Sequence, residues 1–103
     1  MTIIDWLQTW YQEECDGTWE HTYGIRIDTL DNPGWHVQID LAQTSYAKLI
    51  ARQINVENSE TDWLRCSIEE ELFQGYGDPG KLEDILKVFK GWLDLRESDP
   101  PRP

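Results

Sequence analysis

The segment CDGTWEHTYG, which begins at Cys15, gathers most of the residue types in this chain that could do chemistry. It places a thiol, two carboxylates and a histidine close together in sequence. Such a set could serve nucleophilic attack by Cys15, general base catalysis by Glu20 or His21, or metal binding. A fourth interpretation is structural: the segment joins a helix to a sheet, and Trp19 and Tyr23 pack between them.

The sequence around the two cysteines argues against catalysis. A nucleophilic thiol needs a nearby base and often a helix N-terminus, whereas Cys15 follows the end of an expected helix and no glycine cradle follows it. Cys66 falls in the middle of an expected strand on its inward side, where a thiol acts as a small hydrophobic group. We therefore expect no catalytic residues. A small enzyme that uses Cys15, His21 and Glu20 stays open as an alternative.

A metal site is also not expected. Cys15, Asp16, Glu20, His21 and His36 could be imagined around one ion. The spacing of Cys15 and His21 matches no recurrent zinc pattern, and a fourth soft ligand is missing. The segment GYGDPGK lacks the spacing of a phosphate-binding loop. We expect neither a metal nor another cofactor.

The charge balance restricts the partners. Nine basic residues stand against 20 acidic ones, which gives a net charge of −11. Such a field repels phosphate backbones and anionic lipid, so we expect neither nucleic acid nor a membrane as partner. It favours a protein partner with a basic surface, although many acidic domains use their charge only for solubility.

Two widely spaced cysteines do not form a disulfide framework. The N-terminal residues lack the pattern of a signal peptide, and no apolar run approaches the roughly 20 residues of a membrane span. These features predict a reduced, cytoplasmic protein.

Hydrophobic periodicity predicts the elements that position these residues. Apolar residues at helical spacing indicate a first helix that Thr2 caps, and period-two alternation indicates strands. The segment 42–54 fits a helix or a strand, and we favour a strand over 49–57. A final helix would begin with Asp78 as its cap and Pro79 in its first turn. The expected helices cover 2–14 and 78–95, and the expected strands cover 23–30, 35–41, 49–57, 63–69 and 72–77, with the turn DNPG between the first two strands.

These elements predict an α+β fold: an antiparallel sheet of four to five strands, with an N-terminal and a C-terminal helix packed on one face. A single domain would span 1–97, and 98–103 would form a disordered, proline-rich tail. The other sheet face would be open to water, and Trp63 stands out there because a large aromatic side chain on a polar face often anchors an interface. The residues expected on this face are Arg26, Asp28, His36, Gln38, Asp40, Gln53, Asn55, Glu57, Trp63, Arg65 and Ser67.

The sequence resembles the immunity protein 53 family of bacterial polymorphic toxin systems over about residues 5 to 95. The likeness lies in WLQTWY near the start, the box CDGTWEHTYGI, the segment TLDNPGW, and SETDWLRCSIEEELFQGYGDPGKLEDIL. The region from Ala42 to Ile54 is the least similar. A box shared by a whole family is more often structural, and the residues assigned to that role are Trp19, His21, Tyr23, Gly24, Pro33, Gly34 and Trp35.

The resemblance implies that the protein binds a cognate toxin. Many toxins of these systems are nucleases with basic grooves, which an acidic inhibitor can occlude. Two surfaces compete for this role, and we favour the open sheet face together with the variable segment 42–54. The candidates on the sheet are Trp63, Asp28, His36, Asp40, Glu57 and Arg65, and those at the loop end are Asp16 and Glu20. A generic acidic adaptor is the further alternative, and the oligomeric state is left open.

Overall fold

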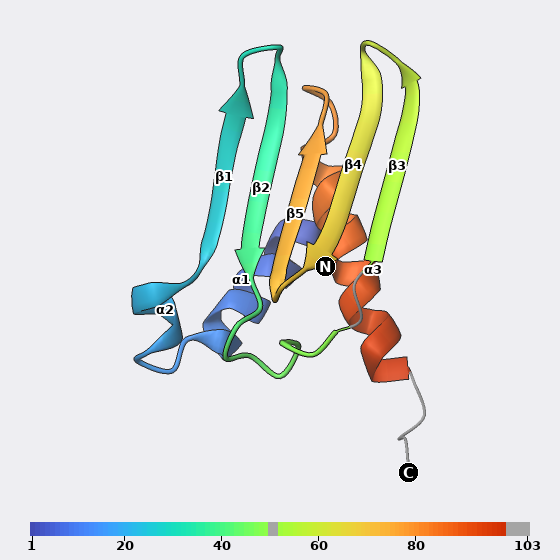
Figure 1. Cartoon of the computed structure of the whole chain (residues 1–103). Helices are drawn as coiled ribbons and strands as arrows, with labels where there is room; N and C mark the ends of the chain where they lie inside the picture. The colour runs from blue at the N-terminus through green and yellow to red at the C-terminus, as the bar shows by residue number, and fades with distance from the viewer. Residues whose placement is uncertain (50–51, 99–103) are drawn as a thin grey trace.

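The computed structural model describes residues 1–49 and 52–98. Two helical segments open the chain, five strands follow, and a long helix closes it (Figure 1). The elements are α1 (Ile3–Glu14), α2 (Trp19–Thr22), β1 (Ile25–Leu30), β2 (Gly34–Asp40), β3 (Arg52–Ser59), β4 (Asp62–Glu69), β5 (Leu72–Gly77) and α3 (Leu82–Ser98).

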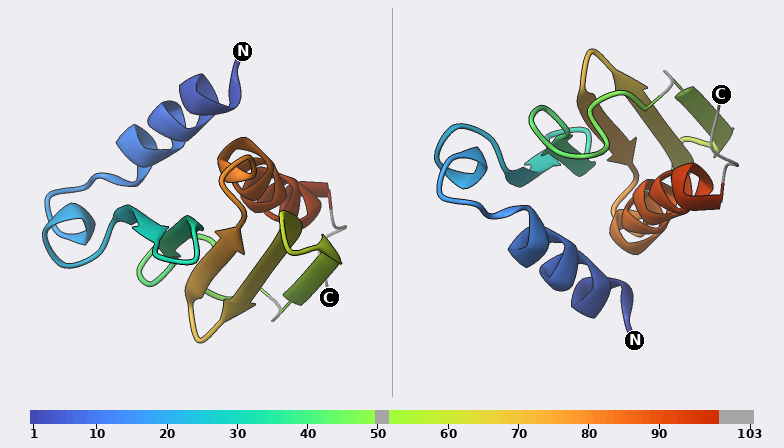
Figure 2. Two further views of the ribbon diagram at one scale, coloured as in Figure 1. Left: turned by 90° about the horizontal axis from the view of Figure 1, so that it is seen from above. Right: turned by 90° about the horizontal axis from the view of Figure 1, so that it is seen from below.

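All five strands form one antiparallel sheet in the order β1-β2-β5-β4-β3. The last strand along the chain, β5, therefore lies in the middle and joins the hairpin β1–β2 to the hairpin β3–β4. Helices α1 and α3 lie on one side of the sheet, and the other side carries none of the helices that the described residues form (Figure 2). The expected α+β architecture is confirmed.

The first helix begins where the sequence predicts. Thr2 and Asp5 form a capping box: the Asp5 backbone N–H donates to Thr2 Oγ1 at 3.1 Å, and the Thr2 N–H donates to Asp5 Oδ2 at 3.3 Å. Both bonds satisfy N–H groups that lack partners within the helix.

Aromatic rings fill the space between the helices and the sheet. The ring of Phe89, on α3, lies 5.1 Å from that of Trp10, 5.0 Å from that of Phe73 and 5.8 Å from that of Trp6. Trp10 also meets the fully buried Trp19 at 5.8 Å, edge to face. Edge-to-face contacts add to the stabilisation from burial, so Phe89 ties both helices to the central strand β5.

The close approach of α3 to β5 requires a glycine. Gly75 lies buried in the middle of β5, and a Cβ atom built on it would collide with Cγ2 of Ile85 on α3. Ile85 is itself completely buried. The helix therefore rests on the bare backbone of the strand at this point.

The apolar side chains of the two edge strands are more exposed than the alternation of apolar and polar residues suggests. Ile27 on β1 and Ile54 and Val56 on β3 lie on the helix side of the sheet, yet they are 41%, 38% and 38% exposed. The reason is that α3 packs mainly on the inner strands β4 and β5.

Several expected boundaries are wrong. Tyr23 and Gly24 do not begin a strand, because 19–22 form the short helix α2 and β1 starts at Ile25. The strand expected over 49–57 is β3, which spans Arg52–Ser59; residues 50–51 lie outside the described part of the chain.

The final helix begins at Leu82, not at Asp78 and Pro79. The carboxylate of Asp78 accepts hydrogen bonds from Trp63 on β4 and from Gly80, so residues 78–81 form a turn tied to the sheet. The helix continues to Ser98, so the first residue of the expected tail 98–103 belongs to the helix, and residues 99–103 lie outside the described part of the chain.

Substitution of Gly75 tests the contact between α3 and β5. We expect Gly75→Ala to lower the free energy of unfolding by about 1–3 kcal/mol, because the added methyl overpacks the contact with Ile85. Urea unfolding followed by circular dichroism measures the change.

Gly91→Ala is the matched control. Apart from the backbone of α3 itself, no described atom lies within 4 Å of a Cβ built on Gly91, so the same substitution there should stabilise the protein by up to about 1 kcal/mol. Equal unfolding midpoints for the two variants would contradict the proposed contact.

Candidate functional site

The loop between α1 and α2 is held by two carboxylates that bind backbone N–H groups. Asp16 Oδ1 accepts from the N–H groups of Thr18 and Trp19, both at 2.9 Å. Glu20 returns the contact, since its Oε1 accepts from the Asp16 N–H at 3.0 Å and its Oε2 from the Gly17 N–H at 2.8 Å. Gly17 has φ +91°, a conformation that suits glycine.

These bonds also set the acidity of the two carboxyl groups. The N–H groups of Trp19 and Thr18 lower the pKa of Asp16, and the N–H groups of Glu20 itself, Asp16 and Gly17 lower the pKa of Glu20. Both groups are therefore ionised near neutral pH and poorly suited to accept a proton in catalysis.

The remaining box residues connect this loop to the sheet. Trp19 is completely buried and Tyr23 is half-buried, whereas the side chain of His21 is exposed. Gly24 pairs with Asp40 at the end of β2: the Gly24 N–H donates to Asp40 Oδ2 at 3.2 Å, and the Asp40 N–H donates to the Gly24 carbonyl at 3.1 Å.

The segment TLDNPGW forms the β1–β2 connection. Pro33 is exposed in the turn, and Gly34 lies buried where β2 passes close to the Gly77 carbonyl of β5. Trp35 Nε1 donates to the Pro79 carbonyl at 2.9 Å, which attaches the hairpin to the turn before α3.

Polar and aromatic side chains cover the middle of the open sheet face. The register places Asp28, His36, Tyr76 and Arg65 in one row across β1, β2, β5 and β4. The rings of His36 and Tyr76 stack at a centroid distance of 4.3 Å and an angle of 9°. The side-chain oxygen of Gln74 accepts from the Tyr76 hydroxyl at 3.0 Å, so these groups form one connected patch.

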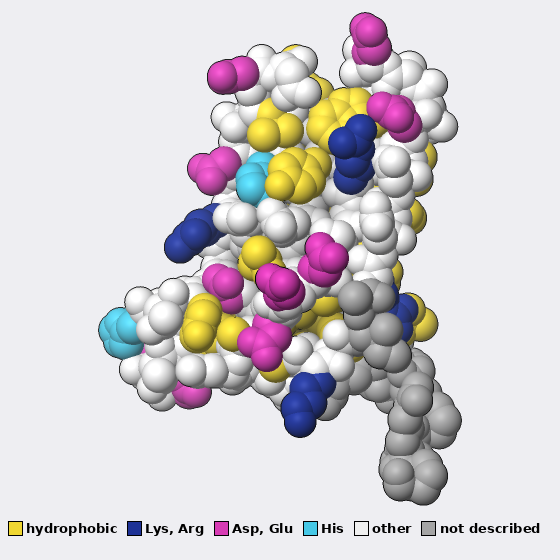
Figure 3. Space-filling view, viewed as in Figure 1, with side chains coloured by type: hydrophobic (Ala, Val, Ile, Leu, Met, Phe, Trp, Pro, Cys, Tyr) yellow, Lys and Arg dark blue, Asp and Glu magenta, His cyan; other side chains and the backbone are white. Residues whose placement is uncertain are grey.

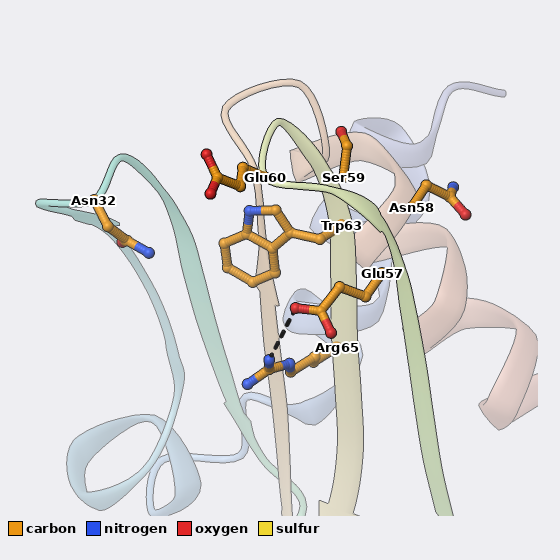
Figure 4. Close-up of a pocket in the computed structure, with 7 residues that line it drawn as sticks. All are labelled: Asn32, Glu57, Asn58, Ser59, Glu60, Trp63 and Arg65. Atoms are coloured by element: carbon orange, nitrogen blue, oxygen red, sulfur yellow. Dashed lines mark ion pairs between the residues drawn. The ribbon is translucent and has the colours of Figure 1, made fainter.

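Trp63 lies at the end of this face that carries the β1–β2 and β3–β4 turns, the upper end in Figure 1. Its backbone pairs with Glu57 across β3–β4, and its side chain is half-buried. Two hollows meet beside it and share Asn32, Trp63 and Arg65, and Figure 4 shows the residues that line the first of them. The larger hollow, about 560 Å³, lies toward the tip of the β3–β4 hairpin, and the smaller, about 460 Å³, lies over Tyr76.

Asp78 fixes the backbone of Trp63. This carboxylate is only 4% exposed; its Oδ2 accepts from the Trp63 N–H at 2.9 Å and its Oδ1 from the Gly80 N–H at 2.8 Å. Lys81 supplies the opposite charge and lies 2.8 Å from both Asp78 and Asp62. The ion pair with Lys81 and the Trp63 and Gly80 N–H groups lower the pKa of Asp78 to about 2.

The lower part of the open face is acidic. The register sets Asp40 and Glu69 on either side of Leu72, and Glu70 and Glu71 form the turn between β4 and β5. Figure 3 shows acidic side chains gathered below the central patch of hydrophobic and histidine side chains.

The structure brings most of the sequence candidates onto one surface. Asp28, His36, Glu57, Trp63 and Arg65 share the open face as expected. Asp40 also lies there, but its carboxylate is engaged by Gly24. Asp16 and Glu20 lie in the loop near α2, outside the sheet.

The residues of this surface that sequence reasoning missed include Gln74 and Tyr76 on β5, Asn32 in the β1–β2 turn and Glu60 in the β3–β4 turn. Alternation along LFQGYG places Gln74 and Tyr76 opposite to Phe73, so the two β5 residues could have been found once Phe73 was assigned to the core.

Within the described residues, no group of three or more histidine, cysteine or acidic side chains could hold a metal ion. Burial raises the pKa of Cys66 to about 12, so this thiol is not a nucleophile at neutral pH. In the same part of the chain, none of the helices is long and apolar enough to cross a membrane.

The fold and this surface define a small α+β protein with helices on one side of its sheet and an open, aromatic and acidic face on the other. The family model for immunity protein 53 matches residues 4–94, so the chain belongs to the immunity protein 53 family. No curated protein and no solved structure matches the chain. Membership indicates an immunity protein.

Acid titration tests the role of Asp78. A carboxyl group whose pKa falls from about 4 in the unfolded chain to about 2 in the folded protein stabilises the fold above pH 4. That contribution is lost as the pH falls from about 4 to about 2. We expect Asp78→Asn to flatten the dependence of unfolding free energy on pH in this window, measured by urea unfolding at several pH values.

Asp28→Asn is the control, because Asp28 is an exposed carboxylate on the open face. The slope between pH 4 and pH 2 should change more in Asp78→Asn than in this control. A slope in Asp78→Asn equal to that of the parent protein would exclude the assigned role.

Proposed function

We propose that this protein neutralises a cognate bacterial toxin by binding it directly and occluding its working surface with the open face of the sheet. The observation that carries the proposal is the position of Trp63. Its backbone N–H is bound by a buried carboxylate, its side chain borders two hollows, and Glu57 and Glu60 line one of them. A large aromatic side chain that borders a hollow is a common anchor of a protein interface.

The charge of the chain supports a basic partner. A net charge of −11 attracts a basic surface and accelerates encounter. A nuclease is a suitable toxin class, because its groove must be basic to bind phosphate, and an acidic face can cover that groove. The mode of inhibition is then steric and electrostatic and needs no reaction by this chain.

Truncation of Trp63 tests the binding face. With the toxin encoded beside this gene, we expect Trp63→Ala to weaken the complex by about 2 kcal/mol or more, as for an interface hot spot. Calorimetric titration measures affinity, and co-expression with the toxin measures protection.

The matched control is Leu95→Ala, which removes an exposed apolar side chain, 46% exposed, from α3 on the helix side. It should bind as the parent protein does. If the two variants bind equally well, the open face is not the interface.

Salt tests the electrostatic part separately. Between about 0.05 and 0.5 M salt, the association rate with the toxin should fall markedly while dissociation changes little, because screening weakens long-range steering. Stopped-flow fluorescence measures both rates. An association rate independent of salt would exclude charge steering.

The enzyme alternative predicts a different set of sensitive residues. We expect the double variant Cys15→Ala, His21→Ala to protect cells as well as the parent protein does. Glu20 is kept, because its carboxylate holds the loop through the Asp16 and Gly17 N–H groups. Loss of protection in a variant that still folds and still binds the toxin would favour catalysis.

A further inference from the structure

The hollow at the upper end of the open face combines an aromatic wall with acidic groups. Trp63 projects from β4 into the space between the β1–β2 and β3–β4 hairpins (Figure 4). Glu57 and Glu60 come from the β3–β4 hairpin, and Asn32 comes from the turn across the gap. An indole face, two carboxylates and an amide oxygen are groups that a cationic side chain can use together.

The chain places one of its own guanidinium groups at the edge of this hollow. The guanidinium carbon of Arg65 lies 6.0 Å from the centre of the Trp63 ring, and its Nη2 lies 3.6 Å from Glu57 Oε1. Arg65 therefore contacts both the indole and a carboxylate, although at the long end of each interaction.

This internal contact is weak enough to be replaced. The side chains of Arg65 and Glu57 are 56% and 64% exposed, and ion pairs between exposed groups contribute little to stability. The backbone beneath is firm by contrast, because Asp78 holds Trp63. The hollow thus combines an indole on an anchored backbone with a cation that is held only by long, exposed contacts.

We infer that this hollow binds an arginine side chain of the partner. The guanidinium group of that arginine stacks on the Trp63 indole and pairs with Glu57 and Glu60, beside the position of Arg65. The inference rests on the proposed function in one respect, because that function makes the partner a protein. Arginine fits better than lysine, because a planar guanidinium can stack on the ring and present parallel N–H groups to a carboxylate at once.

A short peptide tests the hollow without the toxin. The probe is acetyl-Gly-Arg-Gly-amide, and the comparison peptides carry lysine or the uncharged isostere citrulline in place of arginine. Binding is followed by the NMR shift of the Trp63 indole N–H during titration. The arginine peptide should shift this signal and bind more tightly than either comparison peptide, and equal binding by the lysine or citrulline peptide overturns the inference.

Two substitutions with opposite effects locate the site. Glu57→Gln should weaken binding of the arginine peptide about threefold, since one carboxylate loses its charge. Arg65→Gln should strengthen binding about threefold, since the internal competitor is gone.

Two controls change the net charge equally at other places: Glu13→Gln on α1 and Arg26→Gln on β1, both at exposed positions. Glu13→Gln should change the affinity for the arginine peptide less than half as much as Glu57→Gln does. Arg26→Gln should change it less than half as much as Arg65→Gln does. Effects of equal size in the controls would mean that only net charge matters, and would overturn the inference.

The outcomes separate the two proposals. A parent protein that protects against the toxin but gives no Trp63 shift with the arginine peptide overturns the arginine site and leaves the proposed function standing. A protein that binds the peptide at Trp63 but forms no complex with the toxin overturns the proposed function and keeps the arginine site.

Discussion

The open face depends on one buried carboxylate. Strand β5 ends at Gly77, and the chain must leave the sheet there to reach α3, which packs on the face opposite the open face. Asp78 makes this exit possible, because it binds the Trp63 and Gly80 N–H groups and pairs with Lys81. A buried charge is costly unless it is paired and hydrogen-bonded, and Asp78 meets both conditions. The same residue therefore sets the start of α3 and the position of the aromatic anchor.

The central position of β5 connects the region held by Asp78 to the rest of the sheet. Each hairpin alone would present a narrow two-stranded surface, and β5 joins them into one face of five strands. Gly75 lets α3 press directly on β5 from behind, while Tyr76 and Gln74 contact the side chains of His36 and Gln38 on the neighbouring strand β2 in front. Packing on one side thus holds the groups on the other side in register, which is the preorganisation that a binding surface needs.

Local patterns predicted most of the elements, because alternation and helical spacing are local properties. The strand order could not be read in the same way, because it depends on which distant segments pair. Asp78 was misassigned for a specific reason: an aspartate before Pro-Gly is a common start for both a helix and a turn, and only the Trp63 N–H distinguishes them. The need for glycine at position 75 likewise comes from its contact with Ile85 on α3, which the local pattern does not reveal. The charge indicated a basic partner, and the family resemblance alone indicated a toxin.

The two candidate surfaces differ in how much of their hydrogen-bonding capacity is already used. Asp16 and Glu20 accept short bonds of 2.8–3.0 Å from four backbone N–H groups, so a partner that recruited them would loosen the loop. On the sheet face, His36 and Gln38 reach Gln74 only at 3.4 Å, and Arg65 reaches Glu57 at 3.6 Å. Long contacts between partly exposed groups are exchanged for contacts with a partner at little cost. This difference favours the sheet face as the surface that binds.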